Sequence, residues 1–358
     1  MEPWESLVIG AGQAGLSAAH HLLRRGVRTV ILDADEAPGG AWQHRWDALT
    51  MDDVHGVADL PEAAAPPRGA ARANRAVPDY FAAYEQAHRL DVQRPVRVDS
   101  VTSVGDLLQV RAGERSWLTR TLVNATGTWT RPFIPHYPGH ELFRGEQLHT
   151  AGYPGPDHFR GKRVLIVGGG ASAVQFIGAL APITETLWVT RREPVWREEF
   201  DGEAGYQAVQ MVQERVLQGL APQSVVSVTG LALRPQERRA QELGAYRRRK
   251  PMFASIEEDG VRWADGSYEQ VDVILWATGF RAALGHLAPL HLRSPEGGIQ
   301  LVGTPGAGQT PTQTALDPRV QLVGYGPSAS TIGANRAGRS AAAAVVRLLS
   351  AEPEAALG

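Results

Sequence analysis

The same arrangement of glycines between a strand and a helix occurs twice in this sequence. The first copy, Gly10-Ala-Gly-Gln-Ala-Gly15, follows a short apolar run and precedes a helical pattern. The second copy, Gly168-Gly-Gly-Ala-Ser-Ala173, has the same setting. A strand, a glycine-rich turn and a helix begin a βαβ unit, which implies a parallel sheet. The sequence therefore predicts an α/β protein with two tandem Rossmann-like dinucleotide-binding domains.

Each glycine of the first copy has a physical reason to be there. Gly10 allows a tight turn, Gly12 lets the backbone approach a pyrophosphate, and Gly15 permits close packing of helix and strand. The free N–H groups at the helix start, where Gln13 and Ala14 lie, and the positive end of the helix dipole favour a phosphate. The corresponding cofactor-binding residues of the second copy are Gly168, Gly170, Ser172 and Ala173.

The residue that ends the second strand of each unit indicates which dinucleotide binds. Asp33 lies 23 residues after Gly10 and is placed to accept a hydrogen bond from a ribose hydroxyl, as in FAD or NAD. Arg191 lies 23 residues after Gly168 and is followed by Arg192. Guanidinium groups suit the 2′-phosphate of NADPH, although the two arginines would also cap a strand in solvent. We therefore predict FAD or NAD in the first unit and NADPH, with NADH as the alternative, in the second.

The two units also end in the same motif, because residues 122–127 and 273–279 both finish with Ala-Thr-Gly. Gly127, Thr278 and Gly279 are therefore counted among the cofactor-binding residues. A later strand and an Ala-rich helix near the C-terminus are expected to complete the first domain. The predicted domains are an FAD-binding domain of residues 1–150 and 282–358, and an inserted NAD(P)H-binding domain of residues 151–281.

Three further segments are interpreted from their composition. Residues 54–77, rich in Ala, Pro and Arg, are predicted to form a long surface loop, and a helix is expected over residues 78–88. Residues 201–250 have no counterpart in the first unit. Their basic run, residues 247–250, is interpreted as a solvated face or, alternatively, as part of a lid over a substrate pocket.

The absence of cysteine excludes several kinds of chemistry. With no Cys in the chain, disulfides, zinc–thiolate sites, iron–sulfur clusters and thiol nucleophiles are excluded. No metal site is predicted either, because His20 and His21 are adjacent in a helix, which is the wrong spacing for one metal ion. Two-electron chemistry must then come from the cofactors themselves.

Charge and hydropathy limit the partners. The formal net charge is −2, which gives no attractive field for nucleic acid or for an anionic membrane. No apolar run is long enough to span a bilayer. The first strand begins near Leu7, so no secretory signal is expected before it. We predict a cytoplasmic protein that binds a small-molecule substrate, and no nucleic acid and no membrane.

A further motif lies between the two glycine fingerprints. The segment from Phe143 through Gly145 and His149 to Tyr153 has the pattern FxGxxxHxxxY. Together with the fingerprints, the Gly-Gly-Ala-Trp segment of residues 39–42 and the stretches 277–280 and 330–339, this motif resembles the flavin-containing monooxygenases. The resemblance covers essentially the whole chain and is strongest to the short bacterial branch of that family.

The resemblance implies a complete reaction. FAD would be bound and reduced by NADPH or NADH, and would then react with O2 to form a C4a-hydroperoxyflavin. This species would oxygenate a small thioether or amine, or a ketone. The alternative is an NAD(P)H:flavin oxidoreductase or oxidase that produces H2O2 without oxygen transfer, and a third reading is a non-catalytic nucleotide-binding protein on the same fold. The resemblance also suggests a homodimer.

Several residues gain a role only from the resemblance. Gly40, Ala41 and Trp42 match FAD-binding positions. His149 matches the histidine of the signature and is expected to link the domains through a side-chain hydrogen bond. Since Tyr153 is followed by proline, the signature does not choose between N- or S-oxygenation and Baeyer–Villiger oxidation.

Two departures from the family concern the flavin directly. Asp52 stands where the family often has an asparagine facing the flavin, and it is therefore a predicted catalytic residue. The second predicted catalytic residue is His149 of the signature. An ionised carboxylate beside a peroxide anion would repel it. Asp52 is therefore expected to be protonated, to point away from the flavin, or to leave the peroxide short-lived, and the last case favours the oxidase alternative. Near the last helix, Tyr325, Ser328 and the backbone at the helix start near Thr331 are expected to replace an aspartate that holds the ribityl chain in many flavoproteins.

Overall fold

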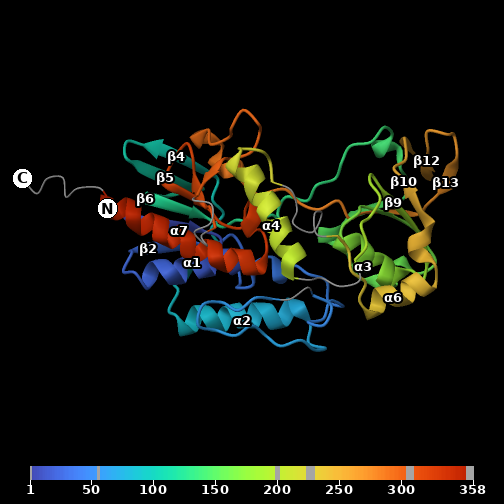
Figure 1. The fold of residues 1–358 in the computed structure, drawn as a ribbon, viewed down its shortest axis with the longest axis horizontal. Coiled ribbons are helices and arrows are strands. Elements are labelled where there is room, and N and C mark those ends of the chain that lie inside the picture. The colour runs from blue at the N-terminus through green and yellow to red at the C-terminus, as the bar shows by residue number, and fades with distance from the viewer. Residues whose placement is uncertain (1, 55–56, 198–201, 223–229, 304–309, 352–358) are drawn as a thin grey trace, which may run out of the picture. The chain divides into compact units, whose positions relative to one another are not determined.

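The chain forms two compact units, each with its own parallel sheet. This computed structural model describes residues 2–54, 57–197, 202–222, 230–303 and 310–351. Unit 1 consists of Met1–Thr130, Val209–Val225 and Ala282–Gly358, and unit 2 of Arg131–Ala208 and Val226–Arg281. The α/β class predicted from the repeated fingerprints is confirmed, and Figure 1 shows the helices and strands of both units.

The elements of unit 1 come from both ends of the chain. In chain order they are β1 (Trp4–Ile9), α1 (Gln13–Leu23), β2 (Thr29–Leu32), η1 (Gly40–Trp42), α2 (Ala73–Ala87), β3 (Val92–Gln93), β4 (Ser100–Val104), β5 (Leu107–Ala112), β6 (Arg115–Asn124), η6 (Gly285–Leu290), β15 (Leu301–Val302), β16 (Gln313–Thr314), β17 (Val320–Leu322), η7 (Gly326–Ser328) and α7 (Thr331–Ala351).

The parallel strands of unit 1 lie in the order β17-β6-β1-β2-β3, and β5 and β4 extend the sheet from β6 in antiparallel pairs. Side chains alternate between the two faces of a strand. Val8, Ile31 and Val123 pack in one buried cluster with side chains of α1, α2 and α7. Their chain neighbours Leu7 and Leu122 pack in a second cluster with side chains of β4, β5 and η6. Both faces of the sheet are therefore covered, as a parallel sheet requires.

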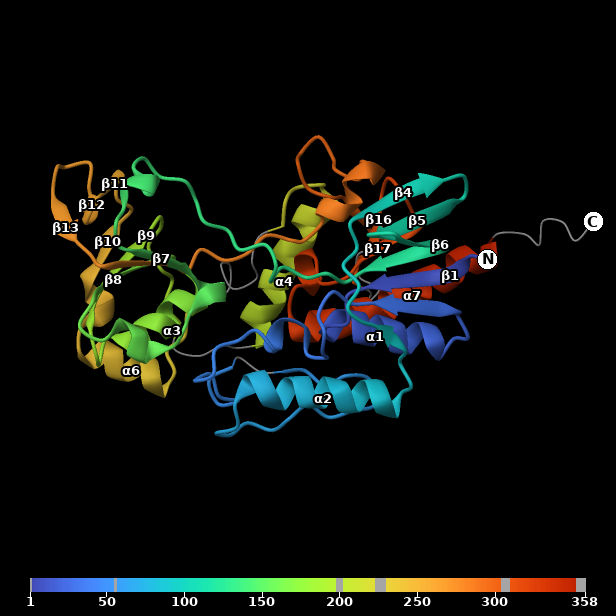
Figure 2. The same ribbon diagram turned by 180° about the vertical axis from the view of Figure 1, so that it is seen from behind.

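Helices α1 and α7 pack directly against each other, as Figures 1 and 2 show from opposite sides. Gln13 Nε2 donates to Asn335 Oδ1 at 3.1 Å, and Ser17 Oγ donates to the Asn335 carbonyl at 3.2 Å. A Cβ on Gly338 would lie 2.5 Å from Ser17 Oγ, so the glycine allows this close approach. The C-terminal helix thus completes the first domain, as expected from the sequence.

The elements of unit 2 repeat the βαβ arrangement and add a small antiparallel sheet. They are η2 (His140–Leu142), β7 (Glu146–His149), η3 (Thr150–Gly152), η4 (Pro156–Phe159), β8 (Arg163–Val167), α3 (Ala171–Leu180), β9 (Glu185–Thr190), α6 (Pro235–Glu242), η5 (Ala245–Arg248), β10 (Arg249–Pro251), β11 (Ser255–Glu257), β12 (Gly260–Arg262), β13 (Tyr268–Gln270) and β14 (Val273–Trp276).

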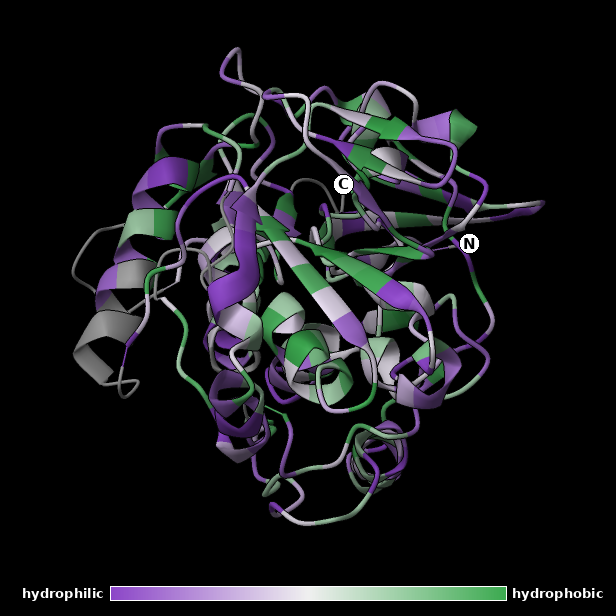
Figure 3. Ribbon diagram, turned by 90° about the vertical axis from the view of Figure 1, so that its right-hand side faces the viewer, coloured by the Kyte–Doolittle hydropathy of each residue, from purple (hydrophilic) through white to green (hydrophobic). Residues whose placement is uncertain are grey.

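The larger sheet of unit 2 has the order β10-β9-β8-β14-β7 and is parallel throughout. On one face, Leu165, Val167 and Trp276 pack with Ile256 and Val261 of the small sheet. On the other, β8 and β9 contact α3. Green, hydrophobic stretches run through the central strands in Figure 3, in keeping with this two-sided burial.

Two boundaries differ from the sequence predictions for reasons of packing. Strand β7 pairs in parallel with β14, so the structure groups residues 131–150 with unit 2, where the sequence analysis placed them in the first domain. Helix α4 (Gly202–Leu217) brings Val216 into the core of unit 1, where a Cβ on Gly326 would lie 2.7 Å from Val216 Cγ1. Neither long-range contact leaves a local pattern in the sequence.

Two further local predictions were confirmed only in part. The helix expected over residues 78–88 is present but begins at Ala73, and Pro78 lies inside it, although proline is most favourable in the first turn. In the basic run, Arg247 and Arg248 are exposed as expected, whereas Arg249 begins β10 and pairs with Trp188 of β9. Among the described residues, no helix combines the length and the apolar character that a membrane span needs.

Candidate functional site

The first glycine of each fingerprint occupies the same place in its unit. Gly10 follows β1 with φ +98°, and Gly168 follows β8 with φ +141°, a region that other residues rarely adopt. A Cβ on Gly10 would lie 2.6 Å from the Ala125 carbonyl oxygen, and one on Gly168 would lie 2.2 Å from that of Ala277. The chain's own packing therefore requires glycine at both positions. We call residues 10–15 glycine turn 1 and residues 168–173 glycine turn 2.

The middle glycines of the two turns are different, because nothing inside the protein requires them. Gly12 has φ −80° and Gly170 has φ −105°, which any residue adopts. Among the described residues, a Cβ on Gly12 would meet only Gly40 Cα, at 4.0 Å, and one on Gly170 would meet nothing within 4 Å. The space in front of each middle glycine is open, which fits the close approach of a pyrophosphate.

Both glycine turns lead into helices whose first N–H groups have no side-chain cap. Gly12 is the N-cap of α1 and Gly170 that of α3, and neither helix start has a capping hydrogen bond from a side chain. The donors available to an anion are the backbone N–H groups of residues 13–15 and 171–173. The Gln13 side chain is engaged elsewhere, since its Nε2 donates to Ala58 and Asn335. A ligand would therefore meet the backbone of Gln13.

The third position distinguishes the two turns. A Cβ on Gly15 would lie 1.8 Å from the Gly10 carbonyl oxygen, so turn 1 admits only glycine there. In turn 2 the corresponding Ala173 is fully buried at the start of α3, and Ser172 beside it is half-buried. Both turns thus keep helix and strand close.

Asp33 supports glycine turn 1 directly. Its Oδ2 accepts a hydrogen bond from the Ala11 N–H at 2.5 Å, and its Oδ1 accepts one from the Asp35 N–H at 2.9 Å. Arg94 lies nearby, with Nε 3.8 Å from Asp33 Oδ1, and is held by Glu85 at 2.7 and 2.8 Å. Each carboxylate oxygen keeps a further lone pair. A ribose hydroxyl at this strand end would therefore find a fixed acceptor.

The Gly-Gly-Ala-Trp segment packs against glycine turn 1. Gly39 and Gly40 have φ +133° and +49°, and a Cβ on Gly40 would lie only 2.9 Å from Gly12 Cα. Gly40, Ala41 and Trp42 form η1, and Trp42 packs against the buried cluster of unit 1. Two backbone segments predicted to bind FAD therefore meet with no side chain between them.

Arg45 was missed by the sequence analysis and lies beside this segment. Its guanidinium lies between two indole rings, with Cζ 5.7 Å from the ring centroid of Trp42 and 4.3 Å from that of Trp129. Burial lowers the pKa of Arg45 to about 10, so the group remains charged at neutral pH. Within the described part of the chain it has no hydrogen bond or ion pair, and its Nε is buried without a partner. A half-buried cation without a charged partner fits an anionic ligand.

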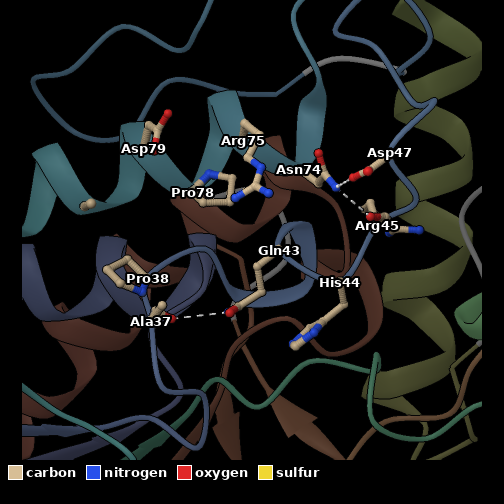
Figure 4. A pocket seen from close by; sticks show the side chains of 11 residues that line it. Ala37, Pro38, Gln43, His44, Arg45, Asp47, Asn74, Arg75, Pro78 and Asp79 are labelled. Atoms are coloured by element: carbon tan, nitrogen blue, oxygen red, sulfur yellow. Dashed lines mark hydrogen bonds between the residues drawn. The ribbon is translucent and has the colours of Figure 1, made fainter.

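The backbone of Arg45 is fixed from α2. Asn74 donates from Nδ2 to the Arg45 carbonyl at 3.0 Å and to Asp47 Oδ1 at 2.7 Å, as the dashed lines in Figure 4 show. These contacts border an open cavity of about 630 Å³ between residues 37–47 and α2. The Trp-x-x-Arg-Trp spacing of residues 42–46 places Arg45 near Trp42 in the sequence, but no local pattern indicates its contact with Trp129.

Three arginines gather at the end of β9 in unit 2. Arg191 and Arg192 are exposed, and neither forms an ion pair within the described ranges. Arg249, from the start of β10, donates from Nη1 to Thr190 Oγ1 at 3.1 Å and forms an ion pair with Glu193. The basic run thus supplies a third cation next to the position predicted to select NADPH, which the sequence analysis did not foresee.

His149 is fixed by both ring nitrogens. Its Nε2 donates to the Gly279 carbonyl at 2.9 Å, and its Nδ1 accepts a hydrogen bond from the Ala151 N–H at 3.1 Å. Burial lowers the pKa of His149, and the ring packs edge-on against Phe280 at 4.9 Å. The neutral ring therefore joins β7 to the segment after β14, all within unit 2. With both nitrogens engaged, no proton-transfer position remains in this arrangement.

The two Ala-Thr-Gly endings are also held by hydrogen bonds. In unit 2, Thr278 Oγ1 donates to the Phe133 carbonyl, and the Phe133 N–H donates to the Gly279 carbonyl at 3.0 Å. In unit 1, the Gly127 carbonyl accepts from the Ala283 N–H at 2.9 Å. Gly127 and Gly279 both have positive φ and open space at the Cβ position. Both endings bring distant segments of their own unit together.

A half-buried histidine that the sequence analysis did not single out lies beside the first of these endings. His286 Nε2 lies 2.6 Å from Asn124 Oδ1, and Asn124 Nδ2 donates to Thr126 Oγ1 at 3.0 Å. Burial lowers the pKa of His286 to about 4, so the ring is neutral. This network orients the end of β6, which borders glycine turn 1 at Ala125.

Asp52, Tyr325 and Thr331 have different environments. Asp52 is exposed, and its carboxylate has no hydrogen bond or ion pair within the part of the chain that the structure describes. Tyr325 is buried, and its hydroxyl accepts from the Ile299 N–H at 3.0 Å, so that side chain belongs to the core of unit 1. Thr331 is the first residue of α7, but its side chain lies outside the described residues.

Comparisons with known proteins agree with this geometry. Residues 7–230 match the family described as pyridine nucleotide-disulphide oxidoreductase. A flavin-containing monooxygenase from Stenotrophomonas maltophilia is 36% identical with a TM-score of 0.81, and the match covers 98% of this chain and 100% of that one. The indole-3-pyruvate monooxygenase YUCCA1 of Oryza sativa subsp. japonica is 27% identical over 77% of each chain.

A more distant structure shares the fold. The OTEMO complex with FAD and NADP is 18% identical with a TM-score of 0.66, over 98% of this chain and 86% of that one. Because this chain has no cysteine, it has no thiol pair for disulfide reduction of its own. The full-length match to a solved flavin-containing monooxygenase and the two glycine turns lead to one conclusion. The chain belongs to the flavin-containing monooxygenases, oxidoreductases that use a flavin and a pyridine nucleotide.

Proposed function

We propose that this chain is an NADPH-dependent FAD monooxygenase that oxygenates small thioethers or amines, or ketones. The observation that carries the proposal is the pair of middle glycines, Gly12 and Gly170, which face open space at uncapped helix starts in two separate sheets. One dinucleotide in each unit gives the two cofactors of a hydride-driven flavin reaction. Bound flavin supplies the chemistry that accepts the hydride and activates O2.

We assign the FAD-binding site to unit 1. The N–H groups at the start of α1 bind the FAD pyrophosphate, and Gly40 keeps the facing backbone clear of side chains. Asp33 accepts from the adenosine ribose, while its bond from Ala11 keeps the turn in register. Arg45 contributes a fixed positive charge to an anionic part of the cofactor, and Trp42 and Trp129 hold its guanidinium in place.

In unit 2, we assign the NADPH. The start of α3 binds the pyrophosphate beside Gly170, and Arg191 and Arg192 bind the 2′-phosphate because they are exposed cations at the end of β9. Arg249 holds Thr190 and Glu193, and so orients the loop that carries both arginines. NADH would lack the 2′-phosphate and would lose these contacts.

His149 acts as a positioning residue in this proposal. Its hydrogen bond fixes the Gly279 carbonyl, and Phe133 donates to the same oxygen. The segment after β14 is thereby held to β7, next to glycine turn 2. The expectation that His149 links the two domains remains a prediction, since both of its hydrogen-bond partners lie in unit 2.

A second function is favoured by one observation, the exposed carboxylate of Asp52. A negative charge at the flavin would disfavour storage of an anionic oxygen species, and the chain would then release H2O2 as an oxidase.

The homodimer also remains a prediction, and the elution volume in size-exclusion chromatography checks it.

The test compares oxygen transfer with peroxide release. The purified yellow protein is mixed with NADPH in air and with a panel of thioethers and ketones, and NADPH consumed, oxygenated product and H2O2 are quantified. Product formed in proportion to NADPH supports the monooxygenase. H2O2 equal to NADPH with every substrate overturns it in favour of the oxidase, and a colourless protein that takes up no FAD overturns both.

A further inference from the structure

A second cluster of polar side chains lies in unit 1, on residues that the cofactor sites do not use. His20 is in the last turns of α1, Glu62 is in the segment before α2, and His88 follows the end of α2. Their possible ligand atoms all lie within 4.8 Å of one another. Figures 1 and 2 show α2 running alongside the layer that contains α1, in keeping with their shared buried cluster.

His20 is the buried member of the cluster. It is 3% exposed, and its ring nitrogens make no hydrogen bond with other described residues. The nearest charged atom is Glu62 Oε1, at 3.9 Å from Nε2, which is too far for a hydrogen bond. Its ring meets that of His88 at 4.7 Å between centroids. Because no neighbouring side chain hydrogen-bonds its ring nitrogens, His20 can donate a lone pair to a ligand at the cluster.

A neutral imidazole offers the lone pair of a ring nitrogen to a metal ion. His21 and Tyr84 complete the surroundings, with ring centroids 5.2 and 5.9 Å from that of His20.

Glu62 is held in place by a turn that ordinarily carries glycine. It has φ +65° and is the third residue of the turn from Leu60 to Ala63, whose N–H donates to the Leu60 carbonyl at 3.0 Å. The Tyr80 hydroxyl accepts from the Leu60 N–H and donates to the Ala63 carbonyl, both at 2.7 Å. Helix α2 thus fixes a glutamate in an unfavourable conformation beside two histidines.

We propose that His20, Glu62 and His88 bind a divalent transition-metal ion, Zn²⁺ above all, leaving a fourth position for water. Two imidazoles and a carboxylate are a ligand set that zinc accepts. Metal–ligand bonds of about 2.0–2.1 Å would draw the three atoms closer together. Glu62 can follow because it is 51% exposed, and its present partner Arg24, at 3.3 Å, is 65% exposed and held only by a weak surface ion pair.

The role of this site is structural and does not depend on the proposed function. The ion would join α1, α2 and the turn between them, three segments that are far apart in the sequence. No metal site is predicted from the sequence, because the adjacent His20 and His21 cannot share one ion. The folded chain instead supplies the other two ligands from distant elements.

The experiment uses the full chain with its flavin, stripped of metal with a chelator and titrated with ZnSO4 by calorimetry, with thermal unfolding as a second readout. We expect about one Zn²⁺ per chain, micromolar or tighter affinity, and a melting temperature raised by several degrees. His88→Gln and Glu62→Gln should weaken binding at least about tenfold, since each removes one metal ligand. His136→Gln, at a histidine of unit 2, is the matched control and should bind as the parent does.

Glu62→Gly keeps the test decisive if a ligand variant folds poorly. Glycine relieves the positive φ, so without metal the melting temperature of this variant should be at most about a degree below that of the parent. Adding Zn²⁺ should not raise it. Zinc that binds the parent only at millimolar concentration, or that binds the His88 and Glu62 variants as tightly as the parent, overturns the proposal.

Discussion

The middle glycines offer the sharpest test of how this chain holds its cofactors. In Gly170→Ala, the new Cβ points into space where no described atom lies within 4 Å, and the backbone φ of −105° is ordinary for alanine. The expected cost in folding is therefore only that of alanine at a helix N-cap, about 1 kcal/mol or less. Such a cost lowers the melting temperature by a few degrees at most.

The effect on NADPH should be much larger. The methyl group would occupy the position from which a pyrophosphate reaches the N–H groups at the start of α3. Hydrogen bonds to a charged group contribute about 1.5–3 kcal/mol each, so the loss of one or two predicts a KM for NADPH raised at least about tenfold. The flavin content should not change, because Gly170 belongs to unit 2.

Two companion variants complete the design. Gly12→Ala should lower the flavin content of the purified protein while the fold persists, since its Cβ would meet only Gly40 Cα at 4.0 Å. Gly168→Ala should destabilise the fold instead, because its Cβ would lie 2.2 Å from the Ala277 carbonyl oxygen. The assay is steady-state NADPH oxidation, with the flavin spectrum and the melting curve as controls. A folded Gly170→Ala protein with an unchanged KM for NADPH would refute the reasoning.

Other predictions concern single side chains. Arg191→Gln should raise the KM for NADPH several-fold more than that for NADH, and equal effects in steady-state assays would count against a 2′-phosphate contact. Asp52→Asn should increase the ratio of oxygenated product to H2O2, measured with a thioether, if its charge disfavours oxygen transfer. Burial lowers the pKa of His286 to about 4, below the 6.5 of the unfolded chain, so the unfolded state binds a proton first on acidification. Stability should fall from about pH 6.5 towards pH 4 by up to about 3 kcal/mol, and urea unfolding of His286→Gln should show a weaker pH dependence.

Much of the fold could be read from local patterns. Each glycine turn lies between a buried strand and an amphipathic helix, so residues 10–15 and 168–173 show both the βαβ order and the point where a phosphate would approach. Short antiparallel strands were harder to predict, because β4, β5 and β11 to β13 have few residues and mixed burial. Their pairing with distant partners stabilises them more than their own propensity does.

The candidate site also contains residues that a motif predicts and residues that only the folded structure identifies. The roles of Gly10 and Gly168 follow from the motif, and the positive φ at both agrees with it. Arg45 and Arg249 became visible only when the chain had folded, since their importance depends on the indole rings around one and on the strand end beside the other. Long cationic side chains reach several possible neighbours, and no spacing rule selects among them.

The sequence alone determined the two-domain α/β architecture and the family, because a glycine turn between strand and helix is a local feature whose first glycine is required by the packing of its own unit. Only the tertiary structure showed that β7 joins unit 2, that His149 holds the Gly279 carbonyl, and that His20, Glu62 and His88 meet. These contacts join residues far apart in the chain. These contacts form because folding buries the apolar surfaces of all the elements together, and no single segment determines which surfaces become neighbours.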